Sequence, residues 1–502
     1  MITLALSAQD TRTPTALEWK PGRIDNVRLR VTDRGYLSSM TKATMTEFDV
    51  AVIGTGSGGE LVATLLAKGS AARPPMRVVV FENELVGGEC PFVACIPSKV
   101  LLARSRQPCP DWSSAVARRD QVTEGRDDAG HVRELLAAGV TVVRGAASVA
   151  APGLVRADAT DYRARHIVVA TGARAKVLTE IACPDDVWMS SDALSSEELP
   201  TSLVIIGGGP IGCELSEVYA RFGTSVTVVE MADTLLSDVE PEISAAMRDH
   251  LVHLGVTVLL SATLSAITKA DKGGYVVHVA GREPITTARV LVGIGKTPRL
   301  DGIGLEAIGL DPANVAVDDS GRLGGLDRVW AVGDVTGIAP YTHGASAQAA
   351  VVAHNIAGGA RSMRAAVMPR CVYTHPPVAA VGPTLSDASL AMDIVSVRVS
   401  YGDIARPATD ELGDGVLIMF ANRADGSVIG ASGMGQSMDE LVSLVTLAVE
   451  TQWPVSRLQH IVQPFPTLSQ LVGHAFQLLA EKVDVANADQ LHSEHRSDRV
   501  DV

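Results

Sequence analysis

The sequence predicts an α/β protein in which one pattern occurs twice before a third region of different character. "FDVAVIGTGSGGELVATLLAKG" from Phe48 and "SLVIIGGGPIGCELSEVYARFG" from Ser202 each run from an apolar strand through glycines into a helix. Each is followed by a second apolar strand that ends in an acid, at Glu82 and Glu230. Strand, glycine-rich turn, helix and downstream acid form the pattern of a dinucleotide-binding unit. We therefore expect two Rossmann-like domains.

Both turns have the GxGxxG spacing, with Gly54, Gly56 and Gly59 in the first and Gly207, Gly209 and Gly212 in the second. The first glycine permits a tight turn, the second lets the backbone approach a pyrophosphate, and the third lets the helix pack closely on the strand. The helix N-terminus then faces the diphosphate, and the downstream acid accepts the ribose hydroxyls. Because both copies have the same context, the sequence predicts two dinucleotide sites.

A different pattern follows "VWAVGDVTG". The helical stretch "HGASAQAAVVAHNIAG" comes first, and a strand-rich stretch with its own turn signals begins near Pro369, which predicts a C-terminal α+β domain suited to dimerisation. The expected parts, in chain order, are an N-terminal extension (1–46, disordered), the first nucleotide domain (47–192), the second (193–320), a return to the first (321–366), the C-terminal domain (367–487) and a polar tail (488–502).

Composition excludes several other classes of protein. The 502 residues carry a net charge of -14, which disfavours nucleic acid and anionic membranes as partners. The apolar runs are shorter than the roughly 18 residues that a membrane-spanning helix needs. Six cysteines are too few for a disulfide scaffold, so we expect a cytoplasmic protein. Residues 1–46 mix acids with bases and do not resemble a secretory signal, and Met45 is an alternative start.

Two of the cysteines, Cys90 and Cys95, lie close together in "GGECPFVACIPSK". In a regular helix, residues five apart have Cα atoms roughly 8 to 9 Å apart, whereas a disulfide needs about 4.4 to 6.8 Å. Pro91 and Pro97 disfavour a regular helix here, so the pair could bond at the start of a helix. A helix N-terminus would also lower the pKa of a thiol. The alternative is two unrelated buried cysteines, but their place directly after the first dinucleotide unit argues against it.

The segment "CPFVACIPSK" resembles the redox-active CxxxxC segment of the class I flavoprotein disulfide reductases, the family of dihydrolipoamide dehydrogenase, glutathione reductase and mercuric reductase. The similarity continues through both GxGxxG units and through "HIVVATGA", "LVGIGKTPRL", "VWAVGDVTG" and "YTHPPVAAVG". It extends from Phe48 to about residue 485, and the pattern is most similar to dihydrolipoamide dehydrogenase.

The resemblance implies FAD in the first fold and NAD in the second. The residues implied for FAD are Gly54, Gly56, Gly59, Glu82, Lys99, Ala147, Gly172, Asp334 on the ribityl chain and Thr342 near the pyrimidine edge. The residues implied for NAD are Gly207, Gly209, Gly212, Glu230 and Gly293. Because "MADTLLSD" after Glu230 has no Lys or Arg to receive a 2′-phosphate, we expect NADH to be preferred over NADPH.

The resemblance also assigns catalytic roles. Cys95 would be the charge-transfer sulfur that faces the flavin, and Cys90 the interchange sulfur that attacks a substrate disulfide. Lys99 would lie near flavin N5, paired with Glu214. Electrons would pass from NADH through flavin to a Cys90–Cys95 disulfide. The other cysteines are expected to stay unpaired, and no metal site is expected: Cys109, Cys183, Cys213 and Cys371.

The chain departs from the family at the catalytic base. The partner subunit usually supplies a histidine from an HxHPTxxE segment, but this chain has "QPFPTLSQ", with Phe465 and Gln470 at the histidine and glutamate positions. Phenylalanine has no exchangeable proton, and glutamine is not an ionised group that could orient a base. His375 and His460 are candidate replacements, although a histidine near a site is more often structural.

Three functions remain open at this point. The first is an NADH-dependent reductase of a small-molecule or protein disulfide, and the second is a diaphorase that reduces quinones without a base. The third is a redox-sensing flavoprotein with a vestigial dithiol. Mercuric reductase is disfavoured, because the last cysteine is Cys371 and no further pair follows near the C-terminus. In each case we expect a homodimer.

Overall fold

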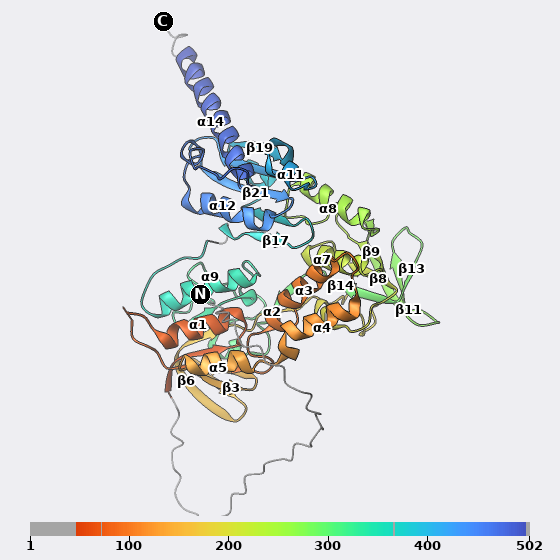
Figure 1. Cartoon of the computed structure of the whole chain (residues 1–502). Coiled ribbons are helices and arrows are strands. Elements are labelled where there is room, and N and C mark those ends of the chain that lie inside the picture. Colours follow the sequence, from red (N-terminus) through yellow and green to blue (C-terminus); the bar gives the residue numbers. More distant parts are fainter. Residues whose placement is uncertain (1–46, 72, 365–366, 498–502) are drawn as a thin grey trace, which may run out of the picture. The chain divides into compact units, whose positions relative to one another are not determined.

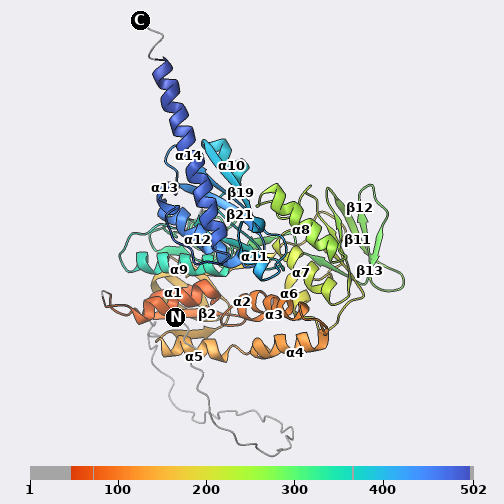
Figure 2. The ribbon, with the colours of Figure 1, turned by 45° about the horizontal axis from the view of Figure 1, so that its top comes forward.

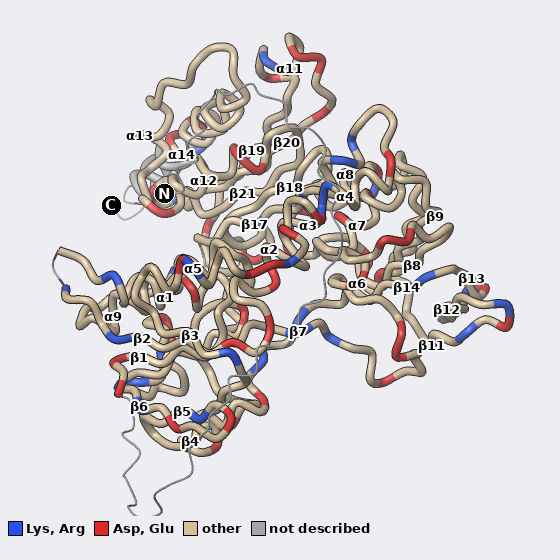
Figure 3. The backbone as a smooth tube through the Cα atoms, turned by 60° about the horizontal axis from the view of Figure 1, so that its bottom comes forward, with Lys and Arg blue, Asp and Glu red and all other residues tan. Residues whose placement is uncertain are grey.

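The computed structural model describes residues 47–71, 73–364 and 367–497, with side chains up to residue 484 (Figure 1). These residues belong to one compact unit. The expectation of a disordered extension over residues 1–46 falls outside the described residues. Among the described helices, none is long and apolar enough to cross a membrane. Basic and acidic residues are both scattered over the described chain (Figure 3).

The first sheet carries the first glycine turn. Its strand order is β3-β2-β1-β6-β5-β4, and β16 also pairs with β6. Strands β3, β2, β1, β6 and β16 are parallel neighbours, whereas β4 and β5 join through antiparallel pairing. The bounds are β1 Glu47–Ile53, β2 Val78–Glu82, β3 Thr141–Arg144, β4 Ala147–Ala151, β5 Leu154–Ala157, β6 Thr160–Val169 and β16 Val329–Ala331.

Alternation along β1 explains how this sheet is covered on both faces. Val50 and Val52 enter the core beneath α1 (Ser57–Lys68) and α9 (Thr342–Ile356), which lie side by side in Figure 1. Ala51 and Ile53 point to the opposite face and pack with residues of β4 and β5. Helix α5 (Ala129–Ala137) contributes to the first face. With both faces buried, the strand is apolar nearly throughout.

The second sheet repeats this arrangement around the second glycine turn. Its order is β10-β9-β8-β14, all parallel, with bounds β8 Ser202–Ile206, β9 Ser225–Val229, β10 Thr257–Leu259 and β14 Arg289–Val292. Helices α7 (Pro210–Arg221) and α8 (Pro241–His253) contribute to the core on one face. A three-stranded antiparallel sheet packs on the other, formed by β11 Leu264–Lys269, β12 Tyr275–Val279 and β13 Ile285–Thr287.

Short elements connect the two nucleotide units. Strand β7 (Ala173–Ala175) pairs with β15 (Lys296–Pro298) in an antiparallel ribbon. Helices α2 (Glu89–Phe92), α3 (Cys95–Ser105) and α4 (Trp112–Val122) follow β2, and α6 (Ser190–Ser195) precedes β8. Helix α3 packs on α4 and on α7 of the second unit. The cysteine-bearing helix is therefore in contact with both nucleotide units.

The last part is a five-stranded antiparallel sheet of order β17-β18-β21-β20-β19, with helices α12 and α14 packed on it (Figure 2). The strands are β17 Arg370–Val372, β18 Val378–Val381, β19 Ile394–Ser400, β20 Val416–Asn422 and β21 Val428–Met434. The helices are α10 Leu385–Ala391, α11 Arg406–Thr409, α12 Met438–Thr451, α13 Val455–Leu458 and α14 Gln470–Ser497. Helix α14 runs through the tail boundary expected at residue 488, because no glycine or proline follows Gly473 to end it.

Candidate active site

The first glycine turn has the shape that a dinucleotide requires. Gly54 has φ +95°, and a Cβ there would collide with the backbone oxygen of Ala170. A Cβ on Gly59 would collide with the backbone oxygen of Gly54, so the helix approaches the strand as closely as glycine allows. A Cβ on Gly56 would meet nothing within 4 Å, so open space lies over the middle glycine. These residues fit a pyrophosphate at the N-terminus of α1.

Glu82 is held at the edge of this turn. One of its carboxylate oxygens accepts hydrogen bonds of 2.8 Å from both the backbone N–H and the hydroxyl of Thr55. The other accepts one of 2.9 Å from the backbone N–H of Glu84. The carboxylate therefore has a fixed orientation beside the glycines, which suits an acceptor for ribose hydroxyls.

The second turn has the same construction. Gly207 has φ +110°, and a Cβ there would come within 2.5 Å of the backbone oxygen of Gly293. A Cβ on Gly212 would collide with the backbone oxygen of Gly207, whereas the space over Gly209 is open to 4 Å. Glu230 accepts hydrogen bonds from the backbone N–H groups of Gly208 at 2.5 Å and Ala232 at 2.7 Å.

The remaining residues expected for FAD lie at the ends of neighbouring elements. Ala147 begins β4. Two residues earlier, the backbone N–H of Gly145 donates to the Glu82 carbonyl at 2.8 Å. Gly172 follows β6 with φ +70°, and its carbonyl accepts from the Arg299 N–H at 3.0 Å. Asp334 begins the turn after β16.

Lys296 is a residue of this region that the motifs did not single out. Its ammonium lies 3.1 Å from the carboxylate of Glu89 and 3.5 Å from that of Asp334. Burial alone would lower the pKa of Lys296, but the two carboxylates outweigh burial and raise it. Its position in "GKTP" gave no sign of this, because its partners lie in α2 and after β16, both far away in the sequence.

Cys90 and Cys95 lie on two different helices. Cys90 is in the first turn of α2, and Cys95 is the first residue of α3. Between these helices Val93 and Ala94 leave the helical conformation, so the separation of a regular helix does not apply. Both sulfurs are free thiols in this structure, which is the reduced form of the expected pair. The Thr342 hydroxyl donates to the Cys90 sulfur at 3.1 Å and lies 3.4 Å from the Cys95 sulfur.

The two thiols have opposite acidities. A hydrogen bond from Cys90 lowers the pKa of Cys95 to about 6, despite partial burial, and Thr342, Lys99 and Lys296 add to the lowering. The same hydrogen bond, together with burial, raises the pKa of Cys90 far above the usual thiol range. The pair therefore shares one proton at neutral pH, with Cys95 as the thiolate and Cys90 as the thiol.

The structure brings Lys99 and Glu214 together. The Lys99 ammonium lies 2.8 Å and 3.1 Å from the two carboxylate oxygens of Glu214, which is buried on α7. The same ammonium lies 4.4 Å from the centre of the Tyr373 ring, and the Tyr373 N–H donates to Glu214 at 3.0 Å. Since Lys99 is one turn from Cys95 on α3, the ion pair connects the helix that carries Cys95 to the second nucleotide unit.

The segment expected to carry a catalytic base carries none. The Phe465 ring is 75% exposed, and the Gln470 side chain accepts a hydrogen bond from the Thr467 N–H at 3.2 Å. Of the two candidate replacements, His460 is exposed, whereas His375 lines a cavity of about 310 Å³ that Lys99 and Tyr373 also line. Burial, followed by the charge of Arg106, lowers the pKa of His375, so its imidazole is neutral at physiological pH.

Two nucleotide turns, a dithiol and an ion pair that joins them define a flavin- and pyridine-nucleotide-dependent oxidoreductase. Comparisons with known proteins agree: residues 48–353 match the pyridine nucleotide-disulphide oxidoreductase family, and residues 368–476 match its dimerisation domain. The chain belongs to this family. The expected resemblance to class I enzymes is thereby confirmed, and the dimerisation domain supports a homodimer.

The similar proteins and solved structures include dihydrolipoyl dehydrogenases and a flavoprotein disulfide reductase. The chain is 31% identical to a dihydrolipoyl dehydrogenase of Halobacterium salinarum over 477 residues, covering 86% of this chain and 98% of the relative. It is 29% identical to the Bacillus subtilis dihydrolipoyl dehydrogenase, covering 86% and 96%. The Cu(II) complex of the HOCl-induced flavoprotein disulfide reductase RclA of Escherichia coli is similar at TM-score 0.78 and 26% identity, covering 86% and 100%. The chain is therefore a FAD-dependent disulfide oxidoreductase that uses NAD(H).

Proposed function

We propose that the chain is a cytoplasmic, NADH-dependent oxidoreductase in which Cys90 and Cys95 alternate between disulfide and dithiol. Bound FAD would supply the two-electron chemistry that connects oxidation of NADH to reduction of the disulfide. The residues that would hold it are those around the first glycine turn, with Glu82 at the ribose. NADH would be held at the second turn, with Glu230 at its ribose, and the Lys99–Glu214 pair would lie near flavin N5.

The observation that carries this proposal is the opposite acidity of the two thiols. Cys95, with its pKa near 6, holds the negative charge, and Cys90 holds the proton. A relay of this kind needs one sulfur stabilised as a thiolate and a second that can attack a substrate. Cys95 begins α3, and the Lys99 charge one turn later also lowers its pKa, which supports the charge-transfer position for Cys95 and the interchange position for Cys90.

Reduction of a substrate disulfide takes two thiol–disulfide exchange steps. The Cys90 sulfur attacks one substrate sulfur, the substrate S–S bond breaks, and the first substrate thiolate leaves. Cys95 attacks Cys90 in the mixed disulfide, the second substrate thiolate leaves, and the Cys90–Cys95 disulfide forms. Two electrons pass to the substrate, and its two thiolates need two protons. The proton on Cys90 can move to Cys95 before the attack. Position 465 is phenylalanine, however, so no histidine there can accept this proton or donate it to a leaving substrate thiolate.

This proton requirement favours a second candidate function. Because Cys90 is the protonated thiol and position 465 is phenylalanine, disulfide exchange should be slow compared with electron transfer to acceptors that need no protein acid. Quinones are one such class. The similar RclA structure is a Cu(II) complex, so Cu(II) is a further acceptor to test. We propose that diaphorase activity exceeds reduction of lipoamide-type disulfides.

The acceptor screen that tests both candidates uses the purified holoenzyme with NADH. The acceptors are lipoamide, a protein disulfide, a quinone and Cu(II). The rate with each acceptor is measured for the unmodified protein and for the Cys90→Ser variant, which is the matched control. If the dithiol carries the electrons, the variant loses disulfide reduction. Quinone reduction that survives in the variant indicates transfer directly from flavin. Equal disulfide reduction by both proteins would contradict the proposed relay.

A further inference from the structure

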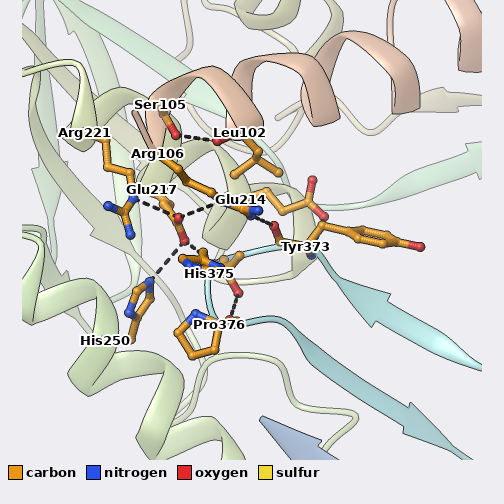
Figure 4. Close-up of polar contacts among 11 residues, drawn as sticks. Leu102, Ser105, Arg106, Glu214, Glu217, Arg221, His250, Tyr373, His375 and Pro376 are labelled. Atoms are coloured by element: carbon orange, nitrogen blue, oxygen red, sulfur yellow. Dashed lines mark hydrogen bonds and ion pairs between the residues drawn. The ribbon is translucent and has the colours of Figure 1, made fainter. Parts of the chain in front are cut away.

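Glu217 is a buried carboxylate that the proposed function does not use. It lies one turn after Glu214 on α7 and has no exposed surface. It accepts hydrogen bonds from Arg221 Nε at 2.9 Å, His250 Nε2 at 3.1 Å and the His375 backbone N–H at 2.9 Å (Figure 4). Helices α7 and α8 and the segment between β17 and β18 therefore meet at one side chain.

Glu214 and Glu217 bind the same short segment of chain. Glu214 accepts from the Tyr373 N–H at 3.0 Å, and Glu217 accepts from the His375 N–H at 2.9 Å. The Tyr373 carbonyl accepts from Arg106, the residue that directly follows α3, at 2.6 Å. The Arg106 guanidinium in turn lies 3.8 Å from Glu217. Two carboxylates and one guanidinium thus fix successive polar groups of the segment 373–375.

This segment determines the surroundings of Lys99. The Lys99 ammonium contacts the Glu214 carboxylate and the face of the Tyr373 ring. Tyr373 also orients Glu214 through its N–H. A shift of the segment would therefore disturb both neighbours of Lys99, and Glu217 is the group that holds the far end of the segment.

The charge of Glu217 matters for this arrangement. Burial alone would raise its pKa, but hydrogen bonds from His250 and His375 and the charge of Arg221 outweigh burial and lower it. The carboxylate is thus ionised at neutral pH and balances the charges of Arg106 and Arg221. Replacement by glutamine keeps the shape but removes the buried charge that faces Arg106 and Arg221, so the hydrogen bonds to the carboxylate weaken.

We propose that Glu217 is a positioning residue that acts on the Lys99–Glu214 pair through the segment 373–375. The inference rests on the proposed role of that pair near flavin N5. In this role Glu217 contacts neither substrate nor cofactor. Its effect on turnover must therefore pass through Glu214, and this dependence separates a positioning role from a general contribution to stability.

The experiment is a double-mutant cycle with Glu217→Gln, Glu214→Gln and both changes together, in the FAD-loaded dimer. The first readout is the rate of flavin reduction by NADH in anaerobic stopped flow. The second is acetylation of Lys99 by acetic anhydride, measured by peptide mass spectrometry, with Lys296 as an internal reference. Glu240→Gln is the matched control, because Glu240 is also buried and accepts a backbone N–H, that of Leu385 at 2.8 Å, outside this cluster.

We expect Glu217→Gln to slow flavin reduction about 5- to 30-fold, and to slow it less than twofold further when Glu214→Gln is already present. Acetylation of Lys99 should rise while that of Lys296 stays constant, and Glu240→Gln should change neither readout. Unchanged acetylation of Lys99 in Glu217→Gln, or rate effects that multiply in the double variant, would overturn the inference.

The readouts also separate this inference from the proposed function. If Glu214→Gln alone leaves flavin reduction unchanged, the proposed role of the Lys99–Glu214 pair is wrong, and acetylation of Lys99 still decides whether Glu217 positions it. If Glu217→Gln does not fold, Arg106→Met is used instead, because it removes the hydrogen bond from Arg106 to the Tyr373 carbonyl. It is judged by the same two readouts against the same control.

Discussion

The Lys99 ammonium and the Glu214 carboxylate form an ion pair with a shortest N–O distance of 2.8 Å, although they lie 115 positions apart in the sequence. The pair joins α3, the helix that begins with Cys95, to the helix that begins at the second glycine turn. It places a positive charge close enough to Cys95 to lower the pKa of that thiol. The chemistry proposed for the dithiol and that proposed for the second nucleotide unit therefore both depend on the contact between α3 and α7.

The middle and third glycines of the first turn should respond differently to a methyl group. Gly56→Ala should fold normally, because a Cβ there meets nothing within 4 Å, but the methyl group would fill the space for the pyrophosphate and lower FAD content. Gly59→Ala should reduce folded yield itself, because its Cβ collides with backbone. Circular dichroism and flavin absorbance per chain measure the two effects. Full FAD content in folded Gly56→Ala would contradict the assignment of this turn.

The reduced protein should gain stability as pH rises from about 6 to about 8. The pKa of Cys95 is about 6 when folded, against about 8.5 for a free thiol, so its thiolate contributes stability above the unfolded pKa and loses it as pH falls toward 6. Cys90, with a raised pKa, opposes this only above about pH 8.5. Thermal unfolding of the reduced protein measures the trend, and Cys95→Ser is the control. The same pH dependence in the control would show that other groups cause it.

NADH should be strongly preferred over NADPH. Glu230 is fixed by two backbone N–H groups beside the second turn, so its carboxylate would face the ribose and repel a 2′-phosphate. We expect kcat/KM for NADH to exceed that for NADPH at least about tenfold, a difference of roughly 1.4 kcal/mol. Initial rates with a quinone acceptor provide the measurement. Comparable efficiencies with the two nucleotides would show that Glu230 does not select between them.

Restoring the missing base should increase only the disulfide reaction. The double change Phe465→His with Gln470→Glu should raise lipoamide reduction toward the roughly 10²- to 10⁴-fold contribution of a positioned acid-base group, and leave quinone reduction unchanged. Failure of this gain alone would be ambiguous, because the imidazole must also reach the dithiol across a dimer interface. Lipoamide turnover of order 10² per second in the unmodified protein would contradict the account, since it lies within the normal range of enzymes.

The sequence was sufficient for the parts of the site that local chemistry determines. The glycine turns, the acids Glu82 and Glu230, and the absence of one regular helix through Cys90 and Cys95 follow from short-range rules of backbone geometry, although the break lies at Val93 and Ala94 and both prolines lie inside helices. The Lys99–Glu214 pair could be expected only through the family resemblance. Other long-range contacts left no local signal.

Lys296, which bridges Glu89 and Asp334, and Glu217, which binds His250 and the His375 N–H, are the clearest examples of such contacts. Their partners come from segments far away in the sequence, so no periodicity or spacing links them. The length of α14 was missed for another reason. The polar composition after residue 487 suggested a tail, although it contains no residue that ends a helix.

The most direct test of the central claim is a count of free thiols before and after anaerobic reduction of the purified protein with NADH. If Cys90 and Cys95 form a redox disulfide, the oxidised protein shows four thiols of the six cysteines, and NADH adds two per chain. Peptide mapping should place both new thiols at Cys90 and Cys95. A gain of fewer than two thiols, or a gain at any other cysteine, would contradict the proposed relay.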